Sequence, residues 1–130
     1  MKRFFTIAVS IVILDQITKV LFTDKHFFII NYITNTGAAF SILQNQNLLL
    51  TIIASLVSIF MLILLKKYKS LEIPLSFIFG GTIGNLIDRI FLGHVRDFID
   101  LKIWPVFNIA DSFNVIGVLI IAYFILKEKV

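Results

Sequence analysis

The chain has 130 residues, of which 58% are hydrophobic and only 15% are charged, and its mean hydropathy is +0.96. A soluble domain of this size has too little polar surface to cover so large an apolar fraction, whereas lipid requires no polar cover. The composition therefore excludes an ordinary soluble domain and predicts a membrane protein. The absence of cysteine excludes disulfides, thiolate metal sites and a cysteine nucleophile.

Four apolar runs predict an all-α membrane protein with four transmembrane helices in a single membrane-embedded domain, residues 1–130. The first run, 4–22, follows basic residues as a signal peptide would, but Asp15 and Lys19 interrupt it and no small-residue cleavage site follows, so we predict a retained span. The run 48–65 has no charge and, at about 1.5 Å per residue, nearly crosses the hydrocarbon core. The runs 73–92 and 112–126 complete the set.

The formal net charge is +4, and the basic residues gather at particular ends of the predicted spans. Because positively charged short loops stay in the cytoplasm, this clustering indicates membrane topology rather than nucleic-acid binding. We therefore predict that both termini and the loop after the second span are cytoplasmic, and that residues 23–47 and 93–110 face outward. The basic residues that carry this prediction are Lys2, Arg3, Lys66, Lys67, Lys69, Lys127 and Lys129.

The two outward segments have the composition of strands. Residues 26–33 are rich in β-branched and aromatic side chains, and residues 95–104 alternate charged and apolar ones. We expect a small outward-facing β layer at the membrane surface, with residues 35–40 forming a turn after the first strand.

Polar residues inside the first and third spans fall in their outward halves. Asp15 and Lys19 are four residues apart, so they share a helix face and are expected to pair, which lowers the cost of burial. Asp88 and Arg89 are adjacent and point in different directions, so they need separate partners. Arg89 is placed to hold a lipid phosphate or a substrate carbonyl, to extend toward the interface, or to pair with Asp15 or Asp88.

Asp97 and Asp111 flank a short segment that leaves the membrane surface and returns at the fourth span. Two carboxyl groups close together share a proton, so that one can activate water while the other donates to a carbonyl oxygen, as an aspartic peptidase requires. The alternative is that Asp111 is the N-cap of the fourth helix and Asp97 a solvated loop charge. Spacing alone favours this alternative.

Other classes of function also remain open. A metal site of His94, Asp97, Asp100 and Asp111 lacks a recognisable ligand spacing, so no metal is predicted. A small transporter or proton-conducting protein would use Asp15, Lys19, Asp88 and Arg89 as a relay, although the inward halves of the spans hold almost no ionisable group. A non-enzymatic adaptor would bind a partner helix through Gly80 and Gly84, which present a small-residue face.

Five blocks, in order over nearly the whole chain, carry a resemblance to a known family. They are LDQITK (14–19), NTGAAF (35–40), GNLIDR (84–89), GHVRDF (93–98) and FNIADS (107–112). With these blocks the chain resembles the lipoprotein signal peptidases, the type II signal peptidases of bacteria. Any one block alone would be a weak signal, whereas five in this order are specific.

The resemblance implies an aspartic endopeptidase of the bacterial cytoplasmic (inner) membrane, a monomer with its active site at the outer leaflet. Its partners would be membrane lipids and prolipoproteins whose cysteine carries diacylglycerol, cut on the N-terminal side of that cysteine, with no cofactor and no nucleic acid. By motif, Asp97 and Asp111 would be the catalytic pair. The residues that would bind substrate are Asn35, Gly37, Asn85, Arg89 and Asn108. Those that would support the site are Asp15, Lys19, Asp88 and Ala110.

One residue departs from the family pattern. Arg96 stands where the family more often has an aliphatic side chain. Pointing inward, it would lower the pKa of the neighbouring carboxyl groups. Strand alternation predicts instead that it points away from Asp97.

Overall fold

The structure, a computed structural model, describes residues 1–38 and 42–128, so Ala39 and Phe40 of the expected turn and Lys129 lie outside the described residues. Four helices long and apolar enough to cross a membrane are present in the described part of the chain, which confirms the predicted helical membrane architecture. They are α1 (Lys2–Phe22), α2 (Asn47–Lys67), α3 (Glu72–Leu92) and α4 (Ile109–Glu128), with a short 3₁₀ turn, η2 (Lys69–Leu71), between α2 and α3. The fourth helix begins three residues earlier than the predicted 112, because Asn108 caps it.

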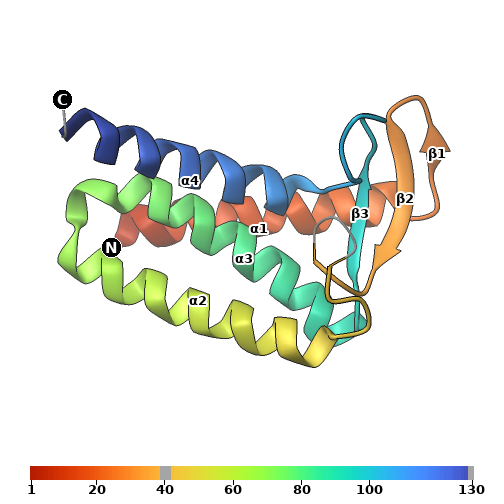
Figure 1. The fold of residues 1–130 in the computed structure, drawn as a ribbon, viewed down its shortest axis with the longest axis horizontal. Coiled ribbons are helices and arrows are strands. Elements are labelled where there is room, and N and C mark those ends of the chain that lie inside the picture. Colours follow the sequence, from red (N-terminus) through yellow and green to blue (C-terminus); the bar gives the residue numbers. More distant parts are fainter. Residues whose placement is uncertain (39–41, 129–130) are drawn as a thin grey trace.

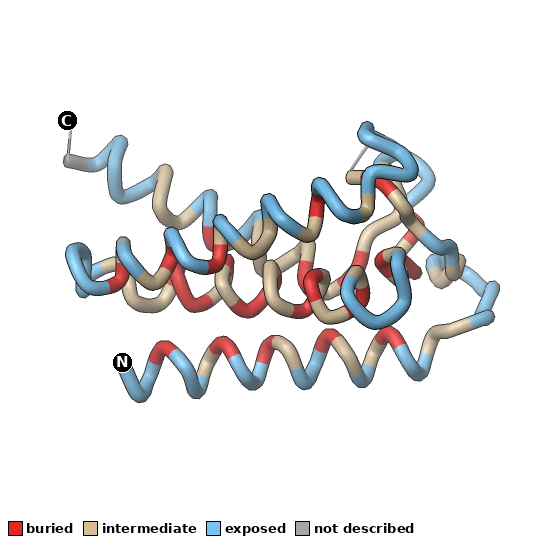
Figure 2. The backbone as a smooth tube through the Cα atoms, turned by 90° about the horizontal axis from the view of Figure 1, so that it is seen from below, coloured by how far each residue is buried: buried red, intermediate tan, exposed pale blue. Residues whose placement is uncertain are grey.

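Helix α3 lies at the centre of the bundle and packs against each of the other three helices (Figure 1). Helix α1 buries one face, whose residues recur every three or four positions, and Figure 2 shows this face turned toward the other helices. The buried residues of α1 are Phe4, Ala8, Ile11, Asp15 and Lys19. The remaining apolar side chains of α1 are largely exposed, as expected of a surface that contacts lipid.

Glycines in α3 allow its neighbours to approach closely. A Cβ atom on Gly80 would lie 2.9 Å from the carbonyl oxygen of Ala8 in α1, and one on Gly81 would lie 2.4 Å from that of Ala110 in α4. A Cβ on Gly84 would lie 2.6 Å from the Asp15 carboxylate. The face expected from the spacing of Gly80 and Gly84 therefore packs against α1 within the chain itself.

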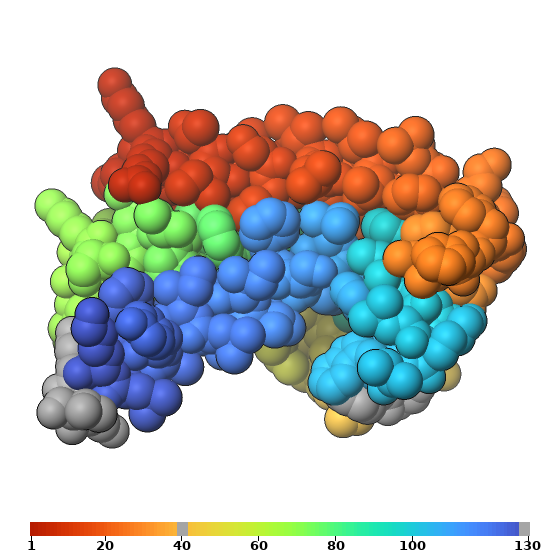
Figure 3. Space-filling view, turned by 90° about the horizontal axis from the view of Figure 1, so that it is seen from above, coloured from red at the N-terminus to blue at the C-terminus, as the bar shows by residue number. Residues whose placement is uncertain are grey.

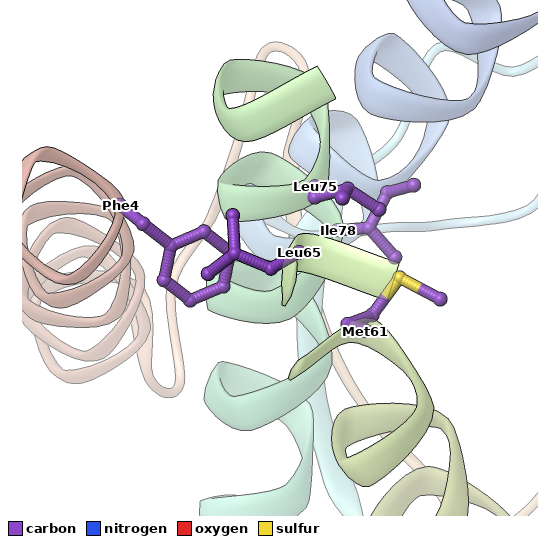
Figure 4. Close-up of a cluster of buried hydrophobic side chains, with 5 residues drawn as sticks. All are labelled: Phe4, Met61, Leu65, Leu75 and Ile78. Carbon is purple, nitrogen blue, oxygen red and sulfur yellow. The ribbon is translucent and has the colours of Figure 1, made fainter. Parts of the chain in front are cut away.

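An apolar cluster joins three helices near the end of the bundle where the chain begins. It contains Phe4 of α1, Met61 and Leu65 of α2, and Leu75 and Ile78 of α3, all at most 9% exposed. In Figure 4 the Phe4 ring points from α1 toward Leu65 of α2. This cluster stabilises one end of the bundle. The buried charged residues of α1 and α3 lie toward the other end.

The strands β1 (His26–Phe27), β2 (Ile30–Asn35) and β3 (Val95–Ile99) form an antiparallel sheet in the order β1-β2-β3. It lies at the end of the bundle opposite both chain termini (Figure 1). The register places Asn35 opposite Val95 and Ile33 opposite Asp97. The predicted small β layer is thereby confirmed.

The predicted strand boundaries were partly wrong. Residues 26–33 form not one strand but a hairpin, which turns at Phe28 with φ of 53°. The strand predicted at 95–104 ends at Ile99, because the Asp100 carboxylate accepts the Lys102 backbone N–H (2.9 Å) and Lys102 adopts φ of 66°. Side-chain bonding of this kind competes with the sheet ladder and starts a turn.

Candidate active site

Asp97 points inward from β3 and is 2% exposed, so the interpretation of this residue as a solvated loop charge was wrong. Its carboxylate accepts hydrogen bonds from the side-chain amides of Asn35 (3.0 Å) and Asn108 (2.7 Å). Burial raises the pKa of Asp97 to about 7, and the negative charge of Asp111 contributes to the rise, while the two amides oppose it. The group therefore holds a proton over much of the range near neutrality.

Asp111 lies in the first turn of α4. The alternative interpretation required it to be the N-cap of this helix, and it is not. That position belongs to Asn108, whose side-chain oxygen accepts the Asp111 N–H (2.9 Å). The Asp111 carboxylate in turn accepts the Asn108 N–H (3.0 Å). This reciprocal pair is a capping box, and it fixes the direction of the Asp111 side chain relative to the helix.

Asn85 and Asn108 join the two carboxyl groups through their amides. Asn85 donates to Asp111 (2.8 Å), and its oxygen accepts from the side-chain amide of Asn108 (2.9 Å). Because that same Asn108 amide also donates to Asp97, a short chain of hydrogen bonds runs between the two aspartates. Asn108 is fully buried beneath them.

Asp97 and Asp111 line one cavity of about 300 Å³ between the sheet and the helices. Figure 3 shows the surface hollowed between α4 and the segment that follows β3. The other residues around this cavity are Asn35, Ala38, Asn85, Arg89, Val95, Trp104, Pro105, Val106, Phe107, Asn114 and Val115. Two carboxyl groups therefore face a space large enough for a water molecule and a peptide bond.

Arg89 lines the same cavity and holds the loop that follows β2. Its guanidinium donates to the Gly37 carbonyl oxygen (2.7 Å) and to the Asn47 side chain (3.4 Å). Within the described residues it forms no ion pair with Asp15 or Asp88. Arg89 thus keeps a positive charge at the wall of the cavity and ties Gly37, after β2, and Asn47, at the start of α2, to α3.

Below the cavity, the expected pair of Asp15 and Lys19 is formed, with 2.8 Å between Oδ2 and Nζ and both side chains fully buried. Lys19 also lies 3.4 Å from Asp88 and donates to the Asn85 oxygen (2.9 Å). The other carboxylate oxygen of Asp15 accepts the backbone N–H of Ala110 (2.9 Å), at the positively polarised start of α4. The network therefore holds α1, α3 and α4 together directly under the two aspartates.

Arg96 points away from Asp97, as strand alternation predicts. Its guanidinium pairs with Asp88 (2.8 Å) and donates to the Gln16 side-chain oxygen (2.9 Å). The Asp88 carboxylate stabilises the charged guanidinium through this hydrogen bond, so the pKa of Arg96 is raised above its ordinary value. Arg96 thus completes the buried network and does not face the two aspartates.

Sequence reasoning missed two polar residues of this region. Gln16 donates to Asp15, Asp88 and the Gly84 carbonyl oxygen. Asn114 lines the cavity. Their signals were present, because Gln16 lies inside the first sequence block and Asn114 is three residues after Asp111, on the same helix face.

Comparison with known proteins gives a consistent family. Residues 7–127 match the family model described as signal peptidase (SPase) II. The lipoprotein signal peptidase of Caldanaerobacter subterraneus subsp. tengcongensis is 44% identical, over 90% of this chain and 91% of that protein. That of Halothermothrix orenii is 38% identical, over 97% of each chain.

A solved bacterial membrane enzyme, determined by the in meso method at 2.3 Å resolution, has the same fold. The two superpose with a TM-score of 0.91 at 32% identity, covering 99% of this chain and 90% of the other. With the family model and the curated relatives agreeing, the chain belongs to the signal peptidase II family of membrane proteases.

Proposed function

We propose that this protein is an aspartic endopeptidase that removes the signal peptide from diacylglyceryl-modified prolipoproteins, cutting on the N-terminal side of the lipidated cysteine. The observation that carries the proposal is the cavity faced by both Asp97 and Asp111. In the described part of the chain, their hydrogen-bond donors are asparagine amides and a backbone N–H, and no lysine or arginine forms an ion pair with either. Such carboxyl groups are free to exchange protons with a substrate.

In the proposed mechanism Asp97 carries the proton, since its pKa of about 7 is the one expected of a general acid near neutrality. Asp111 takes a proton from a water molecule, which attacks the peptide carbonyl carbon, and Asp97 donates its proton to the carbonyl oxygen. The resulting gem-diol collapses as the amine leaves with a proton from Asp111, while Asp97 takes back a proton from one of the two hydroxyls, which restores the starting protonation state of the pair. No covalent intermediate forms. Asn85 orients the Asp111 carboxyl group and Asn35 orients that of Asp97. Asn108, which is buried, also donates a hydrogen bond to Asp97.

A second cavity supports a lipid-bearing substrate. It has a volume of about 300 Å³ and lies against the first two turns of α4, with Asp111 in its lining. Its lining is mainly apolar and consists of Leu101, Trp104, Phe107, Asp111, Ser112, Val115 and Ile116. We assign it to an acyl chain of the diacylglyceryl group, which would place the bond before the modified cysteine beside Asp111.

We also propose that the protein acts as a monomer in the bacterial inner membrane, with the sheet and the cavity at the outer leaflet. The lysines and arginines at the terminal end of the bundle support this orientation. A diacylated cysteine keeps its acyl chains in that leaflet, so the bond to be cut lies at the depth of the cavity.

Two precursors that differ only in cysteine modification test the proposal. Purified protein is expected to cleave the diacylglyceryl-modified precursor, and mass spectrometry is expected to find the lipidated cysteine at the new N-terminus. The unmodified precursor should remain intact. Cleavage of both at equal rates, or at another bond, would refute the proposed specificity, and cleavage of neither would refute the function.

A further inference from the structure

A cavity of about 420 Å³ lies at the end of the bundle opposite the active site, between the start of α1 and the end of α2. Its lining consists of Met1, Phe5, Leu62, Leu65, Lys66, Lys69 and Glu72. None of these residues takes part in the network beneath the aspartates. The cavity is therefore separate from the proposed peptidase site.

Helices α1 and α2 each pack mainly against α3, and the cavity is lined by residues of both. The core cluster drawn in Figure 4 borders the cavity, since Leu65 belongs both to that cluster and to the lining. Phe5 and Leu62 supply apolar walls of the cavity. An apolar chain inserted between the two helices would contact both of them.

The rim of the cavity is positively charged. Lys66 and Lys69 are both exposed, and neither forms an ion pair with any residue that the structure describes. The only carboxylate of the lining, Glu72, is already paired with the amino group of Met1 (2.9 Å). The ammonium of Lys67, by contrast, lies over the Tyr68 ring, 5.1 Å from its centroid, and is not part of the lining.

We propose that this cavity binds an anionic phospholipid of the adjoining leaflet, with its phosphate between Lys66 and Lys69 and an acyl chain along Phe5 and Leu62. The lysine ammonium groups match the negatively charged phosphate of such a lipid, and the apolar walls of the cavity match its acyl chain. Topology alone requires only that basic residues be present at this end, and it does not require a cavity beneath them. The proposal is independent of the proposed peptidase activity.

Native mass spectrometry of the purified full-length chain in detergent tests the site, with phosphatidylglycerol and phosphatidylcholine of identical acyl chains as probes. The wild-type protein should bind phosphatidylglycerol more tightly. The double variant Lys66→Gln/Lys69→Gln should lose roughly 20- to 30-fold in affinity for phosphatidylglycerol, as expected for the removal of two cations from an anionic lipid.

The matched control is Lys67→Gln/Lys127→Gln, which removes the same charge at the same end of the bundle but outside the lining, and it should bind as the wild type does. Leu62→Trp, which fills the cavity without changing charge, should weaken binding of phosphatidylglycerol. Equal losses in the two lysine variants would overturn the proposal. So would equal wild-type affinity for the two lipids, or unchanged binding by Leu62→Trp.

Discussion

At the scale of single residues, Asp97 is subject to opposing effects, of which burial is the largest. Burial and the charge of Asp111 disfavour its ionised form, whereas the amides of Asn35 and Asn108 stabilise it, and the outcome is a pKa of about 7. Below that pH Asp97 is protonated, and above it Asp97 carries a negative charge. In the proposed mechanism the active form is the one that holds a single proton.

The first prediction concerns the pH dependence of cleavage. The value of kcat/KM should fall as the pH rises through about 7, because Asp97 then loses its proton. Asn35→Ala removes a donor that favours the ionised form, so the pKa of Asp97 should rise and the fall should move to higher pH by about one unit. A pH profile of kcat/KM measures both effects.

Asn31→Ala is the matched control for this experiment, since Asn31 lies on the same strand and donates to Asp100 (2.9 Å) instead of Asp97. Its profile should coincide with that of the wild type. An equal shift in the two variants, or no shift in Asn35→Ala, would contradict the assignment of the titrating group to Asp97.

The sequence predicted the candidate aspartates but not how they are held. Motif and charge were enough to single out Asp97 and Asp111, because carboxylates beside apolar spans are costly and rare. The chain of amides through Asn85 and Asn108 depends on how closely α3 approaches the start of α4, which no local pattern specifies. For the same reason the cap of α4 was assigned to Asp111 rather than Asn108.

At the scale of elements, the approach of α3 to α4 determines where Asp111 stands. The carbonyl oxygen of Ala110, the residue before Asp111, lies against Gly81, and a Cβ at Gly81 would meet it at 2.4 Å. Because backbone cannot yield as a flexible side chain can, any side chain at this position must displace the first turn of α4.

We therefore predict that Gly81→Ala lowers the free energy of unfolding by about 1–3 kcal/mol and lowers kcat by tenfold or more, since small displacements of reacting groups are costly. Thermal unfolding in detergent and the cleavage assay measure the two effects. Val118→Ile adds a methyl group at a position 55% exposed on α4 and should change neither. A Gly81→Ala protein with wild-type stability and activity would contradict this account.

The helices were predictable because hydropathy alone determines which segments enter lipid. The strands were less predictable from the sequence. The hairpin within 26–33 turns at Phe28, an aromatic residue with positive φ, where composition predicts a continuous strand. The residue after the turn is held by a contact distant in sequence, because the Asp100 N–H, directly after β3, donates to the Ile29 carbonyl oxygen (2.8 Å).

At the scale of the whole molecule, the two ends of the bundle differ in chemistry. The start of α1, the end of α4 and the α2–α3 connection lie at one end, and the sheet lies at the other (Figure 1). The proposed orientation puts the sheet outside the cytoplasm, because the free lysines of the terminal end favour the cytoplasmic side.

Labelling of single cysteines tests this orientation, and the chain has no cysteine of its own. Ile103→Cys, at a position 91% exposed near the sheet, should react with a membrane-impermeant maleimide added to intact spheroplasts. Ser70→Cys, in the exposed connection between α2 and α3, should react only after the membrane is permeabilised. The reverse pattern would place the cavity on the cytoplasmic side and contradict the proposed access of substrate.

The catalytic pairing of Asp97 and Asp111 is tested most directly by the rate at which Asp97→Asn, Asp111→Asn and the double variant cleave a diacylglyceryl-modified precursor. Each single change should lower kcat by about a thousandfold or more, and the double variant should be no slower than the singles, because the two groups act as a unit. Cleavage near the wild-type rate by either single variant would contradict the assignment of these two residues as the catalytic pair.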